Sequence, residues 1–173
     1  MIKVGINGFG RIGRLILRAL LENYKGKIQV VGINDLGSIE ANAHLIKYDS
    51  THGTLIQDVK TSAEGFQIGD QNIKVFAERD PAKLPWGKIG ADVVLECTGF
   101  FLDKNSAGKH IEAGAKKVII SAPAKNVDFT VVQGVNSKDL KKEHNIISNG
   151  SCTTNCLAPV AMVLENTFGI EYG

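Results

Sequence analysis

One cysteine lies among hydroxyl side chains where a helix is predicted to begin, in the segment Ser148-Asn149-Gly150-Ser151-Cys152-Thr153-Thr154-Asn155-Cys156. A helix N-terminus favours the thiolate form of a cysteine, and the thiolate is the nucleophilic form. Ser151 and Thr153 supply hydroxyl groups beside Cys152. The backbone N–H of Cys152 can donate to an oxyanion. The segment therefore predicts a thiol that attacks a carbonyl carbon.

A second motif, Gly8-Phe9-Gly10-Arg11-Ile12-Gly13, follows a predicted strand and opens a predicted helix. In that context Gly8 permits a tight turn, Gly10 lets the backbone approach a pyrophosphate, and Gly13 allows close packing of helix and sheet. The N–H groups at the helix start then point at the phosphates. Asp35 ends the next predicted strand, where its carboxylate accepts hydrogen bonds from the adenosine ribose and repels a 2′-phosphate. The pattern favours NAD over NADP, and its context argues against a mere glycine-rich turn beside a surface aspartate.

The other cysteines do not indicate a metal centre. Cys156 lies one helical turn beyond Cys152, but two cysteines without further cysteine or histidine partners nearby make a poor zinc site. Cys97 lies in a run of apolar residues and is predicted to belong to the core. A lone cysteine is more often inert than nucleophilic, so the role of Cys152 depends on the whole segment around it.

Composition excludes several classes of protein. The chain has 173 residues, of which 43% are hydrophobic and 22% charged, and it carries a net charge of +2. These values predict a soluble globular protein of one domain with a small part of a second, and no nucleic-acid partner. Three cysteines indicate a reducing compartment. The chain enters a predicted strand directly after Met1, and no apolar run could span a bilayer, so a cytoplasmic protein with no membrane contact is predicted.

Apolar runs bounded by glycines alternate with helical patterns, which is typical of a parallel sheet with crossover helices. Strands are predicted at 2–6, 28–33, 92–96 and 117–120, with further candidates at 131–132 and 146–147. Helices are predicted at 11–22, after Ser38, at 105–113, near 137–142 and at 152–168. We therefore expect an α/β fold of the Rossmann type, a doubly wound and mainly parallel sheet.

Three details refine this expectation. Residues 66–76 are predicted to form an antiparallel hairpin that turns at Gly69-Asp70, inserted in the parallel plan, whereas 51–60 shows no clear period and is predicted to be irregular. Pro159 should kink the last helix. The helix at 11–22 is predicted to present one apolar face made of Ile12, Leu15, Ile16, Ala19 and Leu20.

The segments Ile6-Asn7-Gly8-Phe9-Gly10-Arg11-Ile12-Gly13-Arg14 and Ser151-Cys152-Thr153-Thr154-Asn155-Cys156 are similar to the two signatures of phosphorylating glyceraldehyde-3-phosphate dehydrogenase. The resemblance runs from Met1 to Gly173, about half of that family's length. It implies an NAD-binding domain over residues 1–149. It also implies the start of a truncated catalytic domain, including its first helix, over residues 150–173.

The resemblance also implies roles for individual residues. It makes Cys152 the nucleophile, which forms a thiohemiacetal and then a thioester, and assigns phosphate binding to Ser151 and Thr153. Asn7 belongs to the nucleotide signature, and Arg11 and Ile12 resemble the backbone donors to the pyrophosphate. Further cofactor contacts implied by the resemblance are Arg79 beside the adenine, Thr98, Gly99 and Phe101 on the ribose and nicotinamide side, and Ser121 as a lining residue.

The resemblance implies a glycolytic homotetramer that converts glyceraldehyde 3-phosphate and inorganic phosphate to 1,3-bisphosphoglycerate with NAD. The family's catalytic histidine lies in a segment beyond Gly173, and none of the chain's four histidines stands in a matching context. This chain alone is therefore predicted to bind NAD without turnover. Two alternatives stay open: erythrose-4-phosphate dehydrogenase, which resembles the chain in both signatures, and a non-catalytic NAD-binding module.

Overall fold

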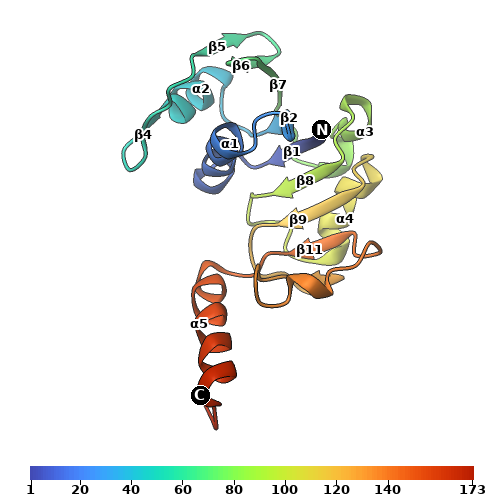
Figure 1. Ribbon diagram of the computed structural model, residues 1–173. Helices are drawn as coiled ribbons and strands as arrows, with labels where there is room; N and C mark the ends of the chain where they lie inside the picture. Colours follow the sequence, from blue (N-terminus) through green and yellow to red (C-terminus); the bar gives the residue numbers. More distant parts are fainter.

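The computed structural model describes residues 1–173, and its centre is one sheet of nine strands in the order β10-β11-β9-β8-β1-β2-β7-β6-β5 (Figure 1). The strands are β1 (Ile2–Asn7), β2 (Ile28–Asn34), β5 (Val59–Ser62), β6 (Gly65–Ile68), β7 (Gln71–Phe76), β8 (Val93–Glu96), β9 (Lys117–Ile120), β10 (Phe129–Thr130) and β11 (Ile146–Ser148). A separate antiparallel pair joins β3 (Tyr48–Asp49) to β4 (Gly53–Thr54). The predicted α/β architecture is confirmed.

The chain also forms five α-helices and two short 3₁₀ helices, of which all but the last α-helix lie between strands. They are α1 (Arg11–Asn23), α2 (Ile39–Lys47), η1 (Pro81–Lys83), α3 (Trp86–Ile89), α4 (Lys104–Glu112), η2 (Ser137–Asp139) and α5 (Cys152–Phe168). Ser38 caps α2 as predicted, because its hydroxyl accepts a hydrogen bond from the N–H of Ala41. No helix has the length and apolar character needed to cross a membrane.

The strands from β10 to β7 pair in parallel, and β6 and β5 complete the sheet in antiparallel fashion. The hairpin predicted at 66–76 is present as β6 and β7 and turns at Gly69-Asp70. It is more than an insertion, because β7 pairs in parallel with β2, with Ile33 opposite Val75. The hairpin therefore extends the main sheet.

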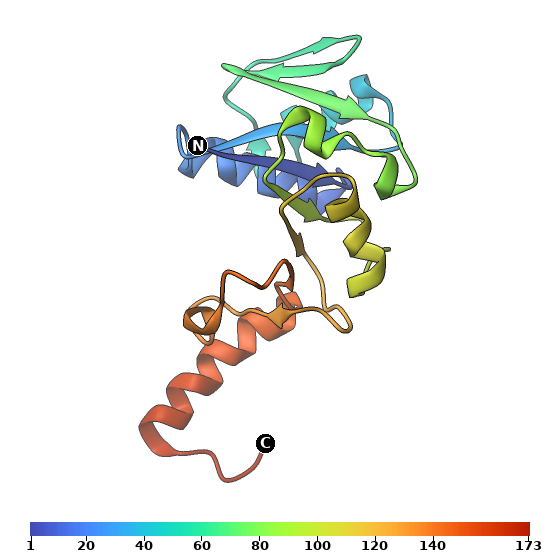
Figure 2. The ribbon, with the colours of Figure 1, turned by 90° about the vertical axis from the view of Figure 1, so that its right-hand side faces the viewer.

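Alternate residues of β1 face opposite layers of the fold. Val4 and Ile6 belong to the largest core cluster, which also contains Leu17 of α1 and Ile46 of α2. Between them, Gly5 faces the other layer, where a Cβ atom would lie 2.6 Å from the indole ring of Trp86. Glycine is thus required at position 5 because α3 presses its tryptophan against the sheet. Figures 1 and 2 show the resulting arrangement of helices around a central β1.

The inner face of α1 differs from the prediction. Its buried residues are Gly13, Leu17, Arg18 and Leu21, whereas Ile12 is about half exposed. Gly13 lies so close to the turn before the helix that a Cβ atom would stand 2.2 Å from the carbonyl oxygen of Gly8. This close approach puts Gly13 against the sheet, and Leu17 and Leu21 follow it at intervals of one helical turn. The helix is therefore correct but its predicted face is mostly wrong, since of that face only Leu20 packs against the largest core cluster.

Buried Arg18 was not expected. Its guanidinium donates hydrogen bonds to the carbonyl oxygens of Ile46, Lys47 and Gly53 at 2.8 to 3.2 Å. These acceptors lie at the end of α2 and in β4, so Arg18 ties the β3–β4 hairpin to α1. A buried arginine is favourable here because several carbonyl oxygens satisfy its donors.

Two other predictions along the chain are corrected. Residues 51–60 are not wholly irregular, because they contain β4 and the start of β5. Asp49 forms the turn before β4 by accepting hydrogen bonds from the N–H groups of Thr51 and His52, a local signal without hydrophobic period. The helix expected near 137–142 is only the 3₁₀ turn η2.

The strand predicted at 131–132 lies two residues earlier, as β10. The N–H of Val131 still donates to Ser148, but that of Val132 donates to the side chain of Asn136 at 2.8 Å. That side-chain acceptor replaces a neighbouring strand, so the ladder ends before Val132.

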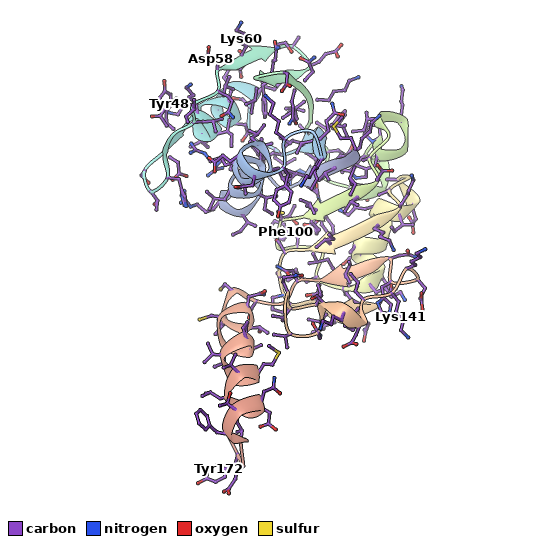
Figure 3. All side chains as sticks on the ribbon, viewed as in Figure 1. Tyr48, Asp58, Lys60, Phe100, Lys141 and Tyr172 are labelled. Carbon is purple, nitrogen blue, oxygen red and sulfur yellow. The ribbon has the colours of Figure 1, made fainter.

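The last helix, α5, begins at Cys152 and continues through Pro159. None of its residues is buried, and its exposed apolar side chains are Leu157, Val160, Val163, Leu164 and Phe168. Figures 1 and 2 show α5 leaving the sheet, and Figure 3 shows Tyr172 beyond its end, far from the strands. The helix therefore presents an apolar surface that this chain does not cover.

Candidate functional site

The carboxyl ends of β1, β2 and β8 meet at one edge of the sheet and enclose a cavity of about 490 Å³. Open parallel sheets bind their ligands at this edge. The cavity is lined by Asn7, Gly8, Gly10, Asn34, Asp35, Leu36, Glu78, Arg79, Cys97, Thr98, Phe100 and Phe101. Seven of the predicted cofactor residues are among them: Asn7, Gly8, Gly10, Asp35, Arg79, Thr98 and Phe101.

The three glycines of the first motif meet different surroundings. Gly8 has a φ of +90°, and a Cβ atom there would lie 2.7 Å from the amide nitrogen of Thr98. At Gly13 a Cβ atom would lie 2.2 Å from the carbonyl oxygen of Gly8, so there is no room for a side chain. Gly10 has nothing within 4 Å of the place where a Cβ atom would be, although it lines the cavity. The turn thus keeps open space at Gly10, and this space fits a pyrophosphate approaching the backbone.

Asp35 holds the glycine-rich turn from the end of β2. Its Oδ2 accepts a hydrogen bond from the N–H of Phe9 and its Oδ1 one from the N–H of Gly37, both at 2.8 Å. The carboxylate is half-buried and lines the cavity. Asp35 therefore places a negative group beside the turn while fixing that turn's shape.

Asn34, which was not predicted as a site residue, fixes the opposite wall. Its side-chain amide donates to the carbonyl oxygen of Glu78 and accepts from the N–H of Glu78, both at 2.8 Å. This reciprocal pair holds the loop that carries Arg79 against the end of β2. The loop lies far from Asn34 in the sequence, so no local pattern could have shown the contact.

The remaining predicted cofactor residues lie near the cavity but outside its lining. Arg11, Ile12 and Gly13 occupy the first turn of α1, where backbone N–H groups have no intrahelical acceptor. Gly99 lies in the turn after β8, and Ser121 follows β9.

The side chain of Arg11 points to another feature, the β3–β4 hairpin. Its guanidinium pairs with Asp49 and lies 3.4 Å from Nδ1 of His52. The backbone N–H of His52 and this guanidinium hold the pKa of Asp49 well below its usual range. The side chain of Arg11 is thus engaged with the hairpin, which leaves its backbone as the part that can serve a ligand.

Cys97 is half-buried and belongs both to the cavity lining and to the edge of the core. Burial raises the pKa of its thiol to about 11, against the opposing effect of a hydrogen bond with Ser121. At neutral pH this cysteine is a neutral thiol and a poor nucleophile. The prediction of a core residue missed that the same side chain faces the cavity.

Cys152 is the first residue of α5, and its side chain is exposed. Ser151 caps the helix, because its hydroxyl accepts a hydrogen bond from the N–H of Thr154 at 2.9 Å. The thiol lies 4.0 Å from the hydroxyl of Thr153. Asn155 donates to the carbonyl oxygens of Asn149 and Ser151, which fixes the segment before the thiol.

None of the four histidines contacts this thiol. His44 packs on Tyr48, His52 faces Asp49, and His144 stacks on Phe129. His110 is fully buried behind the nucleotide cavity. The thiol therefore has hydroxyl groups and a helix terminus near it, but no imidazole base from this chain.

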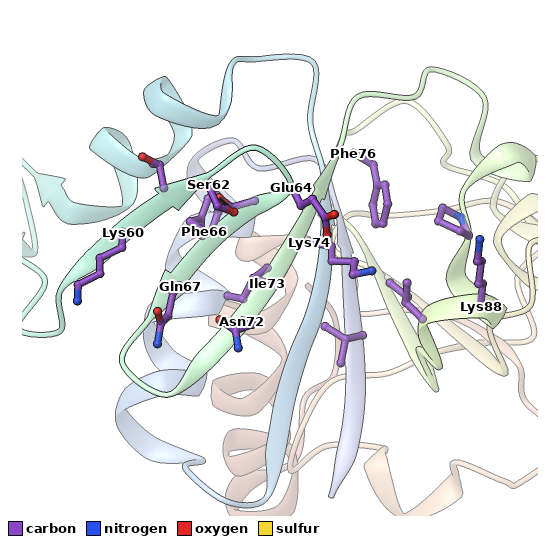
Figure 4. A pocket seen from close by; sticks show the side chains of 15 residues that line it. Lys60, Ser62, Glu64, Phe66, Gln67, Asn72, Ile73, Lys74, Phe76 and Lys88 are labelled. Carbon is purple, nitrogen blue, oxygen red and sulfur yellow. Dashed lines mark hydrogen bonds between the residues drawn. The ribbon is translucent and has the colours of Figure 1, made fainter.

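A larger cavity, of about 650 Å³, lies elsewhere (Figure 4). It is lined mainly by residues of β5, β6 and β7, together with Val31, Glu64, Pro85, Lys88 and Ile89. None of the predicted site residues faces it, and it contains no residue from the two sequence motifs. Size alone therefore does not mark the nucleotide site.

Comparison with known proteins agrees with this geometry. Residues 2–104 match the family described as glyceraldehyde 3-phosphate dehydrogenase, NAD binding domain. The chain belongs to the glyceraldehyde 3-phosphate dehydrogenase family. Residues 151–173 match that family's C-terminal domain. The cofactor of this domain is NAD, and the open space at Gly10 beside Asp35 fits a dinucleotide.

Curated members of the glyceraldehyde 3-phosphate dehydrogenase family match the chain from end to end. The enzyme of Geobacillus stearothermophilus is 56% identical over 173 residues, which is 99% of this chain and 51% of the relative. That of Clostridium pasteurianum is 55% identical over 100% of this chain and 51% of the relative. That of Xanthobacter flavus is 54% identical over 99% and 51%. The chain thus spans about half the length of the curated relatives it matches.

Proposed function

We propose that this chain is the N-terminal part of an NAD-dependent, phosphorylating glyceraldehyde-3-phosphate dehydrogenase. The complete enzyme oxidises glyceraldehyde 3-phosphate and joins it to inorganic phosphate, and it yields 1,3-bisphosphoglycerate in glycolysis. The observation that carries the proposal is an exposed cysteine at a capped helix start, in a chain whose strand ends form a nucleotide cavity.

Residues 1–149 form the NAD-binding domain in this proposal, and residues 150–173 begin the catalytic domain. The backbone of Gly10, Arg11 and Ile12 binds the pyrophosphate, and Asp35 binds the adenosine ribose. The resemblance implies that Thr98 and Phe101 lie on the ribose and nicotinamide side. They line the same cavity as Asp35 and Arg79, however, which favours a role for them at the adenosine end instead. Ser121 and Gly99 complete the surroundings of the cofactor. NAD supplies the acceptor for the substrate hydride when it is bound.

Cys152 performs the covalent chemistry. Its thiolate adds to the aldehyde carbon of the substrate and forms a hemithioacetal. Loss of the hydride leaves a thioester on Sγ. A phosphate oxygen then attacks the thioester carbon, the carbon–sulfur bond breaks, and the acyl phosphate leaves as the thiolate is regenerated. Ser151 and Thr153 bind phosphate in this last step, and the N–H of Cys152 donates to the developing oxyanion.

The 173-residue chain alone binds NAD but does not turn over. None of its histidines reaches Cys152, and loss of a general base typically lowers a rate by about 10²–10⁴. The complete enzyme is a cytoplasmic homotetramer. A non-catalytic NAD-binding module is the second candidate function, and the missing imidazole beside Cys152 is the observation that favours it for this chain.

NADH formation by the full-length protein tests the proposal. We expect Cys152→Ser to abolish turnover of glyceraldehyde 3-phosphate, while NAD affinity measured by calorimetry stays unchanged. Cys156→Ser is the matched control and should keep its activity, because Cys156 lies one turn farther along α5. Turnover by Cys152→Ser at the wild-type rate would overturn the proposal. If the wild-type protein oxidised erythrose 4-phosphate faster than glyceraldehyde 3-phosphate, the substrate would be erythrose 4-phosphate.

A further inference from the structure

The end of β8 buries a carboxylate that takes no part in the chemistry above. Glu96 is only 1% exposed, and its partners Asn7 and His110 are buried while Thr98 is half-buried. Its Oε2 accepts from the side-chain amide of Asn7 at 2.6 Å and lies 2.9 Å from Nε2 of His110. Its Oε1 accepts from the N–H of Thr98 at 2.7 Å and from the Thr98 hydroxyl.

The tautomer of His110 follows from its other neighbour. Trp86 Nε1 lies 2.9 Å from Nδ1 of His110, and an indole N–H can only donate. Nδ1 is therefore the acceptor, and Nε2 carries the proton that it donates to Glu96. Nδ1 thus accepts and carries no proton, and the full burial of His110 and Trp86 holds the ring in this one orientation.

Glu96 thus accepts four hydrogen bonds from neutral groups and faces no cation. Only an ionised carboxylate can accept on both oxygens without presenting a donor of its own. A glutamine at this position would turn an NH₂ group towards either Asn7 and His110 or Thr98, which are all donors. The chain therefore needs the charge at this position to orient Asn7 and Thr98 together.

Both of these partners line the nucleotide cavity. The hydroxyl of Thr98, which donates to Glu96, accepts a hydrogen bond from the N–H of Phe100 at 3.1 Å. Gly99 between them has a φ of +77°, so the chain turns sharply there. Figure 3 shows Phe100 just beyond the end of β8, and this residue is 84% exposed. Glu96 therefore anchors the turn that brings Phe100 and Phe101 to the cavity wall.

We propose that Glu96 is a positioning residue of the nucleotide site, which fixes the Cys97–Phe101 turn where that turn lines the cavity. The proposal rests on the proposed function in one respect, that NAD occupies this cavity. Asp35 and Arg79 line the same cavity as the two phenylalanines, so this turn belongs to its adenosine end. His110 and Trp86 act behind Glu96 by fixing the direction of its Oε2.

Calorimetric titration of Glu96→Gln with NAD and with ADP-ribose, which lacks the nicotinamide, tests this assignment. We expect both ligands to bind about tenfold more weakly. The NH₂ group of the glutamine would face a buried hydrogen-bond donor, and neither group would have an acceptor. Glu112→Gln is the matched control on exposed α4 surface and should bind both ligands as the wild type does. Trp86 is the only tryptophan of the chain, so its emission reports the network. The emission should change in Glu96→Gln, since His110 must release Trp86 to accept from glutamine.

Unchanged affinity of Glu96→Gln for both ligands would overturn the proposal, as would a loss confined to NAD, because the turn would then not serve adenosine. If Glu96→Gln does not fold, Thr98→Val replaces it, since it removes the hydroxyl that links Glu96 to Phe100. Thr98→Val should also weaken ADP-ribose binding, and wild-type affinity would contradict the proposal. Failure of the wild-type chain to bind NAD would instead refute the proposed function.

Discussion

Around the nucleotide cavity, side chains from β1, β2 and β8 are tied together below the surface, whereas α5, which begins at Cys152, buries none of its residues. The cavity walls are held by Asn7, Asn34 and Glu96, each bonded to another strand end or loop. The thiol is held only by contacts within a few residues of itself. The cavity is therefore shaped by contacts between distant parts of the sheet, whereas the thiol lies exposed at the start of a helix that buries none of its residues.

The largest effect is expected from a substitution in the glycine turn, which should affect both the stability of the chain and NAD binding. Gly13→Ala should unfold or severely destabilise the chain, because the new methyl group would lie 2.2 Å from the Gly8 carbonyl oxygen. We expect a loss of about 3 kcal/mol in the free energy of unfolding and no detectable NAD binding. Denaturant titration and calorimetry measure the two effects.

Gly10→Ala is the matched control for that experiment. Its methyl group would meet no atom within 4 Å, so the free energy of unfolding should hardly change. NAD should nevertheless bind far more weakly, because the methyl group would occupy the space proposed for the pyrophosphate. If both alanine variants lowered the free energy of unfolding equally, the open space at Gly10 would not exist in the folded chain, and the pyrophosphate assignment would fail.

Alkylation sharpens the contrast between the two regions. Iodoacetamide at neutral pH should modify exposed Cys152 at least about a hundredfold faster than Cys97, whose thiol is half-buried and has its pKa raised to about 11. Mass mapping of the modified peptides gives both rates. Saturation with NAD should slow Cys97 further because that residue lines the cavity. Faster reaction at Cys97 would reverse the assignment of nucleophile and lining residue.

Coenzyme preference tests the contribution of Asp35. Asp35→Ala should reduce the preference for NAD over NADP by roughly tenfold, because the carboxylate no longer repels a 2′-phosphate. Part of the loss will appear as weaker NAD binding, since Asp35 also holds the N–H groups of Phe9 and Gly37. Parallel titrations with both coenzymes separate these effects, and Asp139→Ala, on the exposed turn η2, serves as the control.

The smallest expected effect concerns acid stability at the far edge of the sheet. Lys104, together with the N–H groups of Ile146 and Asn145, lowers the pKa of Asp128 from 3.8 to about 2. Because the folded chain holds the ionised form, this contribution is present above pH 4 and is lost as the pH falls towards 2. Asp128→Asn should therefore lower the midpoint of thermal unfolding at pH 7 and leave it nearly unchanged at pH 2.

Local patterns predicted much of the fold and part of the site. The strand–turn–helix context of Gly8, Gly10 and Gly13 and the place of Asp35 were readable because each depends on neighbours within one βαβ unit. The helix start at Cys152 was readable for the same reason, since a cap involves residues only three positions apart. The close packing of Gly13 is also a local signal for the inner face of α1, because it fixes the side of the helix that meets the sheet.

The hydrogen-bond network behind the cavity could not be predicted from local sequence patterns. Asn7 and Glu96 are 89 residues apart, and Trp86 and His110 are 24 apart. The sequence around each of these residues does not predict which residue it contacts. The same holds for Asn34, which meets Glu78 across 44 residues. The contacts of Asn7, Asn34 and Glu96 exist because the strand order brings the ends of β1, β2 and β8 to one edge, whereas the Trp86–His110 contact joins α3 to α4.

Spacing along the chain thus decided the elements, the glycine turn and the position of the nucleophile, because these depend on hydrogen bonds and sterics within a few residues. Strand order and packing decided that β7 joins the parallel sheet, that Cys97 faces both core and cavity, and that Glu96 is buried between Asn7, Thr98 and His110. Those outcomes depend on residues distant in sequence meeting in a buried space, where each donor must find an acceptor.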